Sequence, residues 1–310
     1  MRHRVFAAVQ IGLSLVLLAV VVWRHLPSQL GAELVGANYA VLLLTLMMVP
    51  ILVMLRAVRW HVLARTRDPH IPMALSFHSY MAGLALAVIT PFSAGELARG
   101  AFAAPSDRAG FVGLTFLDKM LDVTSLMVLV CSGFMVVAPG RLKLAGAGAM
   151  LLLFVAIASA RSFAGFAATL MPRWRFVGAL MRGVEAGRAV PTGTLLGCFV
   201  VAVGNFALLY FHLFLIMYAF APEIDWRAAG LFPMVTFISR AVPSIAGLGV
   251  REFTASAIFA EVEYNISSTG AVVATFLQFV GANVLPAGAW LLVSGGFRRF
   301  FAAAREGGGD

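Results

Sequence analysis

The apolar residues of this chain fall into long segments separated by short loops in which arginine gathers. A transmembrane helix needs about 20 consecutive, mostly apolar residues. The segments that satisfy this requirement are 5–23, 39–55, 118–139, 144–160, 194–221 and 269–294. Segment 5–23 is longer than the apolar region of a signal peptide, so we expect it to remain as the first span. The pattern predicts an all-α polytopic membrane protein with about six full spans.

Two further apolar segments, 72–89 and 228–242, run into stretches that combine helix breakers with charge. The first stretch is Thr90-Pro-Phe-Ser-Ala-Gly-Glu-Leu-Ala-Arg99, and the second is Ser239-Arg-Ala-Val-Pro-Ser-Ile-Ala-Gly-Leu-Gly-Val-Arg-Glu252. The residues expected to break the helices are Pro91, Gly95, Pro243, Gly247 and Gly249. Broken helices occur at membrane depth only where they pack in protein or line a wet cavity. Two ordinary surface loops with paired charges would also produce this pattern.

The basic segments predict the orientation of the chain. The N-terminus, loop 56–67, segment 161–190 and the tail should be cytoplasmic, because cytoplasmic loops collect Lys and Arg. This orientation determines whether the chain crosses the membrane an even or an odd number of times between one basic segment and the next. The required numbers of crossings result if 72–104 and 228–260 are re-entrant hairpins. The parity is the same if each hairpin is two tilted spans, which raises the number of crossings to about ten. Both arrangements predict one transmembrane domain, 1–310, made of two inverted repeats, 1–143 and 144–310, with a site where the broken helices meet.

Segment 161–190 differs from the spans. Its apolar residues recur at helical spacing, with Arg175, Arg182 and Glu185 off the apolar stripe. This pattern is typical of an amphipathic helix lying on an anionic lipid surface. A packed connector helix with a solvated face would show the same spacing.

Composition supports a membrane protein and excludes several functions. Of the 310 residues, 61% are hydrophobic and 12% charged, whereas a soluble domain is about half apolar and a quarter charged. The formal charge of +9 lies in the loops, so we expect no nucleic-acid partner. No nucleotide-binding glycine motif or nucleophile elbow occurs. Cys131 and Cys198 lie inside apolar spans and no His/Cys/carboxylate cluster has zinc-like spacing, so we expect no metal and no cofactor.

Four charged motifs follow one another along the chain. They are Arg56-x-x-Arg59-Trp60, Pro91-x-x-x-Gly95-Glu96-x-x-Arg99, Asp118-Lys119-x-x-Asp122, and Pro243 followed by Gly247-x-Gly249-x-Arg251-Glu252. In this order they resemble the flippase-like membrane region of the lysylphosphatidylglycerol synthase family, the bacterial multiple peptide resistance factors. That family usually has Glu-Arg where this chain has Asp118-Lys119, which argues against a bidentate contact there.

The resemblance implies lipid translocation across the bacterial inner membrane. It does not imply aminoacylation, because the 310 residues include no soluble aminoacyltransferase domain; we therefore expect no enzyme activity. A flippase needs cations for a headgroup phosphate and carboxylates that balance those cations when the site is empty. The candidate substrate-binding residues are Glu96, Arg99, Asp118, Lys119, Asp122, Arg251 and Glu252. Alternatively, these charges pair only with each other and lock the broken helices.

The other members of the motifs are expected to have simpler roles. Arg56, Arg59 and Trp60 directly follow segment 39–55, a position that predicts anchors at the headgroup level. Asp118 opens segment 118–139 and is expected to border the cavity from the cytoplasmic side. Arg240 is expected to cap the second hairpin.

Three functions compete at this point. The first is a flippase or scramblase for an anionic or polyprenyl-phosphate-type lipid. The second is a non-transporting membrane partner of a lipid-processing or glycosyltransferase enzyme. The third is an intramembrane enzyme using the Asp118/Asp122 carboxylates, although no nucleophile and base accompany them. Lipid movement by the purified protein in liposomes separates the first from the others.

Overall fold

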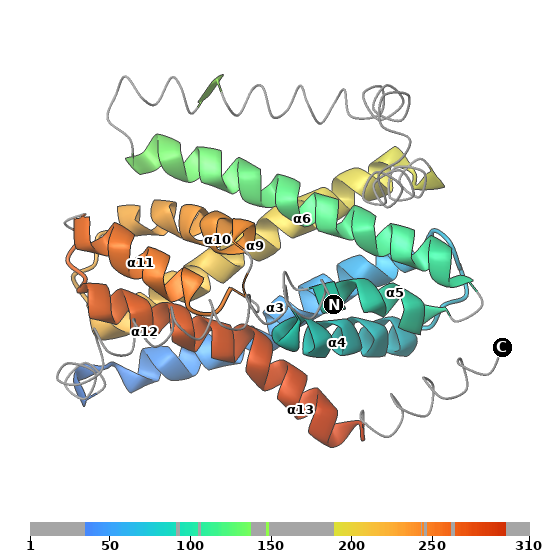
Figure 1. Cartoon of the computed structure of the whole chain (residues 1–310), viewed down its shortest axis with the longest axis horizontal. Helices are drawn as coiled ribbons and strands as arrows, with labels where there is room; N and C mark the ends of the chain where they lie inside the picture. Colours follow the sequence, from blue (N-terminus) through green and yellow to red (C-terminus); the bar gives the residue numbers. More distant parts are fainter. Residues whose placement is uncertain are drawn as a thin grey trace, which may run out of the picture.

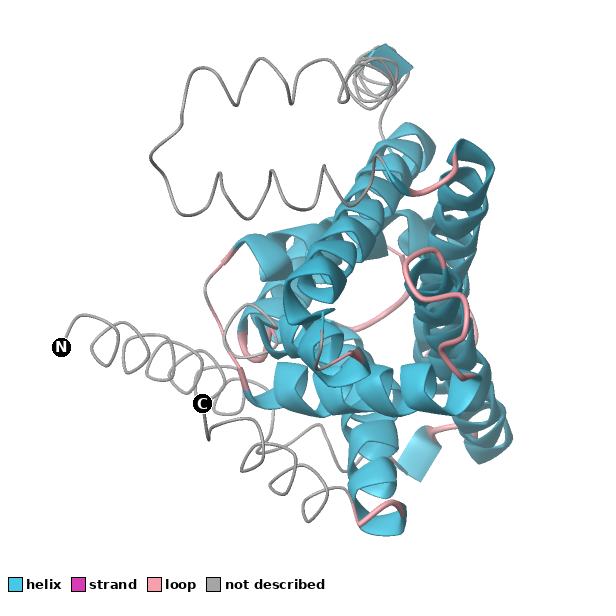
Figure 2. Ribbon diagram, turned by 90° about the vertical axis from the view of Figure 1, so that its right-hand side faces the viewer, coloured by secondary structure: helices cyan, strands magenta, loops and turns pink. Residues whose placement is uncertain are grey.

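The computed structural model describes residues 35–90, 94–104, 107–137, 147–148, 189–242, 244, 247–261 and 264–295, and all its regular elements in these ranges are helices (Figure 1). Figure 2, turned by 90°, shows these helices joined by loops. The predicted segment 5–23 and the helix breakers Pro91 and Pro243 lie outside the described residues, as do segment 144–160 except for 147–148 and the predicted surface helix of 161–190 except for 189–190.

Four helical stretches of the described chain are long and apolar enough to cross a membrane. They are α3 (Tyr39–Arg65), α6 (Arg108–Val137), α9 (Thr192–Phe220), and the stretch formed by α12 (Ser268–Phe279), a π turn (Val280–Val284) and α13 (Leu285–Val293). The shorter elements are α4 (Met73–Ile89), η1 (Ala94–Leu97), α5 (Ala98–Ala103), η3 (Trp226–Leu231), α10 (Phe232–Ala241) and α11 (Val250–Glu261). The chain is thus a multi-pass membrane protein, and its described part is all-helical, as predicted. The number of six spans and the inverted repeat remain predictions.

Helix α3 is longer than the sequence pattern predicted. Its N-cap residue Asn38 accepts hydrogen bonds from the backbone N–H groups of Ala40 (3.1 Å) and Val41 (3.3 Å). The helix then continues through residue 55, the predicted end, to Arg65. Trp60 is fully buried and donates a hydrogen bond to Ser79 Oγ (2.9 Å). The expectation that Arg56, Arg59 and Trp60 form a headgroup-level edge is therefore wrong, because α4 and α6 cover this part of α3.

Helix α6 begins earlier than the span that the sequence pattern predicted, 118–139. It begins at Arg108, so Asp118 lies well inside the helix instead of opening the span. After Asp107 and Arg108, at the start of the helix, the residues up to Asp118 are uncharged. The helix can therefore start before the acidic motif, which then lies within the apolar length of the span.

Helices α3 and α9 form an antiparallel central pair. The N–H of Asn38, at the start of α3, donates to the carbonyl of Ala219, at the end of α9 (2.8 Å). Two hydrophobic cores flank this pair. One is built on the second half of α9 with η3, α10, α11 and α12, and the other on the second half of α3 with α4 and the start of α6.

Each broken stretch contains helices that pack against each other, with glycine at positions that do not tolerate a Cβ. In the first, α4 packs on η1 and α5, and Gly95 lies so close to Leu86 that a Cβ on Gly95 would collide with the backbone of Leu86. In the second, α10 packs on α11, and the turn between them contains Gly247 (φ +80°) and Gly249 (φ +78°). A positive φ is costly for residues with a Cβ, which explains the need for glycine at both positions.

Candidate functional site

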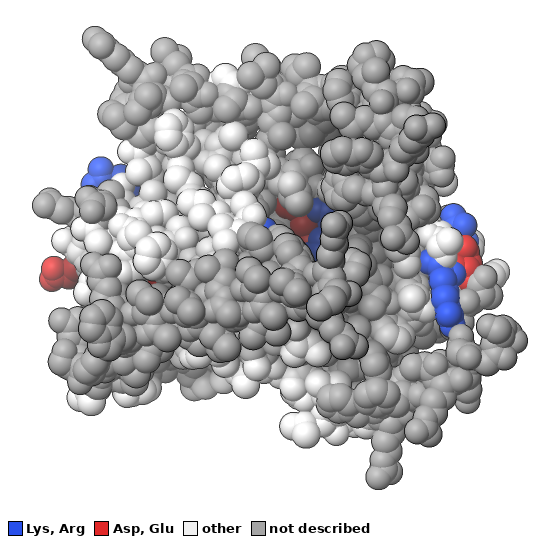
Figure 3. Space-filling model, in the orientation of Figure 1, with Lys and Arg blue, Asp and Glu red and all other residues white. Residues whose placement is uncertain are grey.

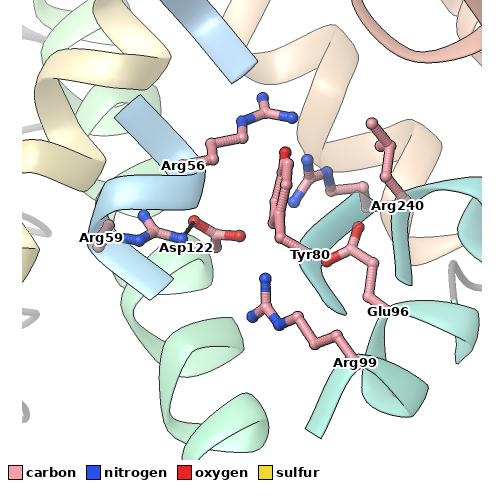
Figure 4. A pocket seen from close by; sticks show the side chains of 8 residues that line it. Arg56, Arg59, Tyr80, Glu96, Arg99, Asp122 and Arg240 are labelled. Carbon is pink, nitrogen blue, oxygen red and sulfur yellow. Dashed lines mark hydrogen bonds and ion pairs between the residues drawn. The ribbon is translucent and has the colours of Figure 1, made fainter. Parts of the chain in front are cut away.

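A polar cavity of about 260 Å³ lies between the two hydrophobic cores. The hairpin around Gly95 contributes Leu84, Ala87, Val88 and Glu96 to its wall, and the hairpin around Gly247 contributes Thr236, Ser239, Arg240, Val242, Ser244, Gly247 and Arg251. A narrower space continues from it and is lined by Arg56, Arg59, Tyr80, Leu84, Glu96, Arg99, Asp122 and Arg240 (Figure 4). The two hairpins therefore meet across one continuous site.

The cavity lies near the middle of the spans. The residues that the long helices contribute to this cavity are Arg56 from α3, Lys119 and Val123 from α6, Leu209 from α9, and Gln278, Phe279 and Asn283 from α12 and the π turn. Each of them lies in the middle third of its helical stretch. Polar groups at this depth are costly unless they are paired or serve a function. The π turn that carries Asn283 is itself a helix irregularity that is frequent at functional sites.

A buried ion network joins α3, α5 and α6 at one side of this site (Figure 4). Arg59 is 3% exposed and forms ion pairs of 2.7 Å with Asp118 and with Asp122. Asp118, fully buried, also forms an ion pair with Arg99, whose guanidinium lies 4.7 Å from the centre of the Trp60 ring. These contacts hold Arg99 against the protein, so its charge is already compensated by Asp118.

Two further ion pairs lie on the cavity wall. Lys119 pairs with Glu96 across α6 and η1, and both side chains are about one-fifth exposed. Arg251 pairs with Glu252 (2.6 Å) and lies over the Phe279 ring at 4.8 Å. Glu252 also accepts a hydrogen bond from the N–H of Gly249 (2.8 Å), which caps the first turn of α11. Glu252 therefore stabilises the second hairpin as well as compensating Arg251.

Two arginines at the cavity, Arg56 and Arg240, form no ion pair with another described residue. Arg56 donates from Nε to Asn205 Oδ1 (2.8 Å), and Asn205 donates in turn to the carbonyl of Leu52 (3.0 Å). The guanidinium of Arg240 lies 5.3 Å from the centre of the Phe206 ring. Neither contact neutralises the positive charge, so both guanidinium groups remain available to an anion.

Charged side chains of the described part also gather at the two ends of the long axis, as Figure 3 shows together with charge in a hollow near the middle of the same face. At the end where α3 stops, Arg67 pairs with Asp107. The hydrogen bond from Arg67 lowers the pKa of the Asp107 carboxyl. Beyond the end of α9, Arg227 pairs with Asp225 (2.5 Å), and hydrogen bonds from Arg227 likewise lower the pKa of Asp225. These exposed pairs lie outside the spans and leave the central site as a separate feature.

The seven predicted substrate-binding residues all lie at the site, but only five of them line the cavity or its narrow extension. Glu96, Lys119, Asp122 and Arg251 line the cavity or its narrow extension, as does Arg99. Asp118 and Glu252 lie behind the wall and are buried. Arg56, which was placed at the headgroup level, and Arg240, which was read as a cap, were both missed. The isolated placement of Arg240 before Pro243 in an otherwise uncharged stretch was a usable signal for the latter.

The described residues offer no group of three His, Cys, Asp or Glu side chains placed to hold a metal ion. The carboxylates of the site face guanidinium or ammonium groups instead. The arrangement offers an anion positive charge and hydrogen-bond donors.

Comparison with known proteins agrees with the resemblance of the motifs. A search of curated proteins found no match to this chain. The family model of the lysylphosphatidylglycerol synthase TM region matches residues 7–288, which include all four charged motifs. The chain therefore belongs to the family defined by the lysylphosphatidylglycerol synthase TM region.

Proposed function

We propose that this protein moves a lipid with an anionic headgroup between the leaflets of the bacterial inner membrane, through the cavity between its two hairpins. The observation that carries the proposal is the pair of arginines, Arg56 and Arg240, that lie at mid-span depth without a carboxylate partner among the described residues. An uncompensated charge at this depth is costly. A headgroup phosphate would compensate both cations and would gain charge-assisted hydrogen bonds from them.

The wall of the cavity suits a lipid headgroup in transit. Its polar contacts come from side chains on both hairpins and on the spans, while Leu84, Val88 and Val123 supply apolar surface. The hollow in Figure 3 lies between the two charged ends and not at either of them. A headgroup could therefore enter from the side that faces the bilayer, with its acyl chains left in hydrocarbon.

The Lys119–Glu96 pair gives the site a way to adjust its charge. Both side chains are partly exposed to the cavity, so the pair is less tightly buried than the Arg59–Asp118 pair. An entering phosphate competes with Glu96 for Lys119 and leaves the carboxylate free to accept hydrogen bonds from a hydroxyl or amine of the same headgroup. Release of the lipid restores the pair, which keeps the empty cavity partly neutralised.

Movement between leaflets requires that the cavity open to each side in turn. The antiparallel packing of α3 on α9, and the recurrence of a long helix, a broken hairpin and a second long span in each half, support the predicted inverted repeat. In such transporters one half rocks against the other around a fixed site. Here the cavity contacts both hairpins, so relative motion of the halves would change its exposure.

The test is lipid movement by the purified protein in liposomes that contain phosphatidylglycerol with a fluorescent label on its acyl chain. Quenching by a membrane-impermeant reductant reports how much labelled lipid reaches the outer leaflet. We expect movement with the native protein, strong loss with Arg240→Gln, and no change with Arg227→Gln, which alters an exposed arginine outside the spans. Movement that survives both Arg240→Gln and Arg56→Lys would refute the proposed role of the cavity.

The same assay separates the alternative functions. If the folded native protein moves no lipid of any class, but co-purifies in constant ratio with a lipid-modifying enzyme, it is a membrane partner of that enzyme. Hydrolysis or group transfer on the labelled lipid, detected by chromatography, would instead indicate an enzyme.

A further inference from the structure

The charges at the site do not balance, and the imbalance specifies the ligand further. The cations that line the cavity and its extension number six: Arg56, Arg59, Arg99, Lys119, Arg240 and Arg251. The carboxylates that line them or pair with them number four: Glu96, Asp118, Asp122 and Glu252. Six positive against four negative charges leave two positive charges among the described residues, and these belong to Arg56 and Arg240.

We propose that the headgroup site is selective for a terminal phosphate with two negative charges, that is, a phosphate monoester or the outer phosphate of a diphosphate. This inference rests on the proposed lipid function and concerns its substrate class. A phosphate monoester carries about −1.5 to −2 charges at neutral pH, which matches the two uncompensated cations. A phosphodiester carries a single negative charge and leaves one of the two guanidinium groups without a counter-charge, while a zwitterionic headgroup adds a further positive charge.

The positions of the two arginines fit a terminal phosphate. Asn205 accepts from the Nε of Arg56, and Tyr80 forms a second hydrogen bond with the same guanidinium. A guanidinium has five N–H donors, so donors remain for a phosphate. Arg240 reaches the same space from the other hairpin, and both side chains line the narrow extension together with Tyr80 (Figure 4). A phosphate between them would present oxygens in two directions. Only a terminal phosphate has three unesterified oxygens for these donors, since a diester has two.

The hydroxyl groups of the larger chamber extend this argument. Thr236, Ser239 and Ser244 line the cavity on the side of the second hairpin. Hydroxyl groups can donate to a further phosphate oxygen without adding charge. A diphosphate would therefore place its outer phosphate between the arginines and its inner phosphate along these hydroxyls.

Binding of two matched amphiphiles to the detergent-purified full chain tests the proposal. The probes are dodecyl phosphate, a monoester, and dodecyl methyl phosphate, its diester, and the measurement is isothermal titration calorimetry. We expect the monoester to bind at least about tenfold more tightly near neutral pH, because it gains a second charge-assisted contact. Equal affinity for the two probes would overturn the proposal.

A change of pH provides an independent readout. The second ionisation of a phosphate monoester has a pKa of about 6, so its advantage should shrink when the pH falls from about 7.5 to about 5.5. The titratable and charged groups that line the site with these two arginines are Arg59 from α3, Tyr80 from α4, Glu96 from η1, Arg99 from α5, Lys119 and Asp122 from α6, and Arg251 from α11. No described histidine lines the site. The diester keeps one charge throughout this range, so any change in its affinity with pH comes from the protein groups. That change is subtracted from the change measured for the monoester.

Two variants decide whether Arg240 and Arg56 produce the preference. Arg240→Gln should reduce the monoester advantage to about twofold or less. Arg56 is then the one uncompensated cation, so the second negative charge of the monoester finds no partner. Arg56→Lys keeps the charge but loses the planar fork, so it should weaken the monoester more than the diester. Arg227→Gln should bind both probes as the native protein does. An unchanged preference in a helical, monodisperse Arg240→Gln protein would overturn the assignment.

The liposome assay distinguishes failure of this inference from failure of the proposed function. Movement of labelled phosphatidic acid, a monoester, should exceed that of labelled phosphatidylglycerol, a diester, at the same pH. Equal movement of both would leave lipid transport standing and reject selectivity for the dianion. Absence of movement for either lipid, with no binding of dodecyl phosphate, would reject both.

Discussion

Replacement of the buried Asp118 by Asn should destabilise the protein far more than replacement of Glu96, on the cavity wall, by Gln. Asp118 is fully buried and is the only described carboxylate that pairs with Arg99, whose side chain is 3% exposed. Asparagine keeps the size of the side chain and removes its charge. Arg59 retains its 2.7 Å ion pair with Asp122, whereas Arg99 keeps only its contact with the Trp60 ring.

The size of the effect follows from burial. Breaking a buried ion pair by removing one partner costs about 3–5 kcal/mol, because the remaining charge is left without solvent. The matched comparison is Glu96→Gln, which breaks the Lys119–Glu96 pair. Its side chains are 20% and 22% exposed, so water or the cavity can partly solvate Lys119, and the expected cost is at most about 1 kcal/mol.

The free energy of unfolding should be measured in mixed micelles of detergent and dodecyl sulfate, with far-ultraviolet circular dichroism as the signal. The double variant Arg99→Met/Asp118→Asn should recover part of the loss, since the uncompensated charge is gone; coupling of about 0.5–3 kcal/mol is expected for residues in contact. If Asp118→Asn lowers the free energy of unfolding no more than Glu96→Gln does, the ion network does not stabilise the packing of α3, α5 and α6, and our account of it is wrong.

Two further predictions concern the hairpin and the orientation of the chain. Gly249→Ala should cost about 1–2 kcal/mol because φ is +78° there, whereas Gly288→Ala, in a helix with open space around the Cβ position, should be neutral or mildly stabilising; equal effects would contradict the role of the positive φ. In a chain whose two native cysteines are replaced, His70→Cys should react with impermeant reagents only from the cytoplasmic side and Glu223→Cys only from the outer side, as measured in cells and inverted vesicles. Reaction of both from one side would rule out the orientation given by the basic loops.

The sequence alone determined the class of protein and the residues from which the site is built. Lipid admits only backbone that satisfies its own hydrogen bonds, so apolar length identifies helical spans without reference to their neighbours. Glycine at 95, 247 and 249 marks the two hairpins, because close packing at Gly95 and positive φ at Gly247 and Gly249 are local demands on the backbone. Charges within such segments are equally visible, since few other reasons exist for them at that depth.

Only the tertiary structure decided which of these charges are compensated. Arg99 and Arg251, the arginines that the motifs favoured as phosphate contacts, pair with Asp118 and Glu252. Arg56, read from the sequence as a headgroup anchor, instead contacts a residue 149 positions away, Asn205 on α9.

The physical reason is that pairing depends on distance across the fold. A charge is neutralised by whichever side chain a neighbouring helix brings within a few ångströms, and Coulomb attraction in a low-dielectric interior rewards that proximity alone. The order of residues along the chain records the charges but not these distances. The packing of α3 against α9, and of α6 against α3 and α5, therefore decides that Arg56 and Arg240 are the cations left without carboxylate partners in the described part of the protein.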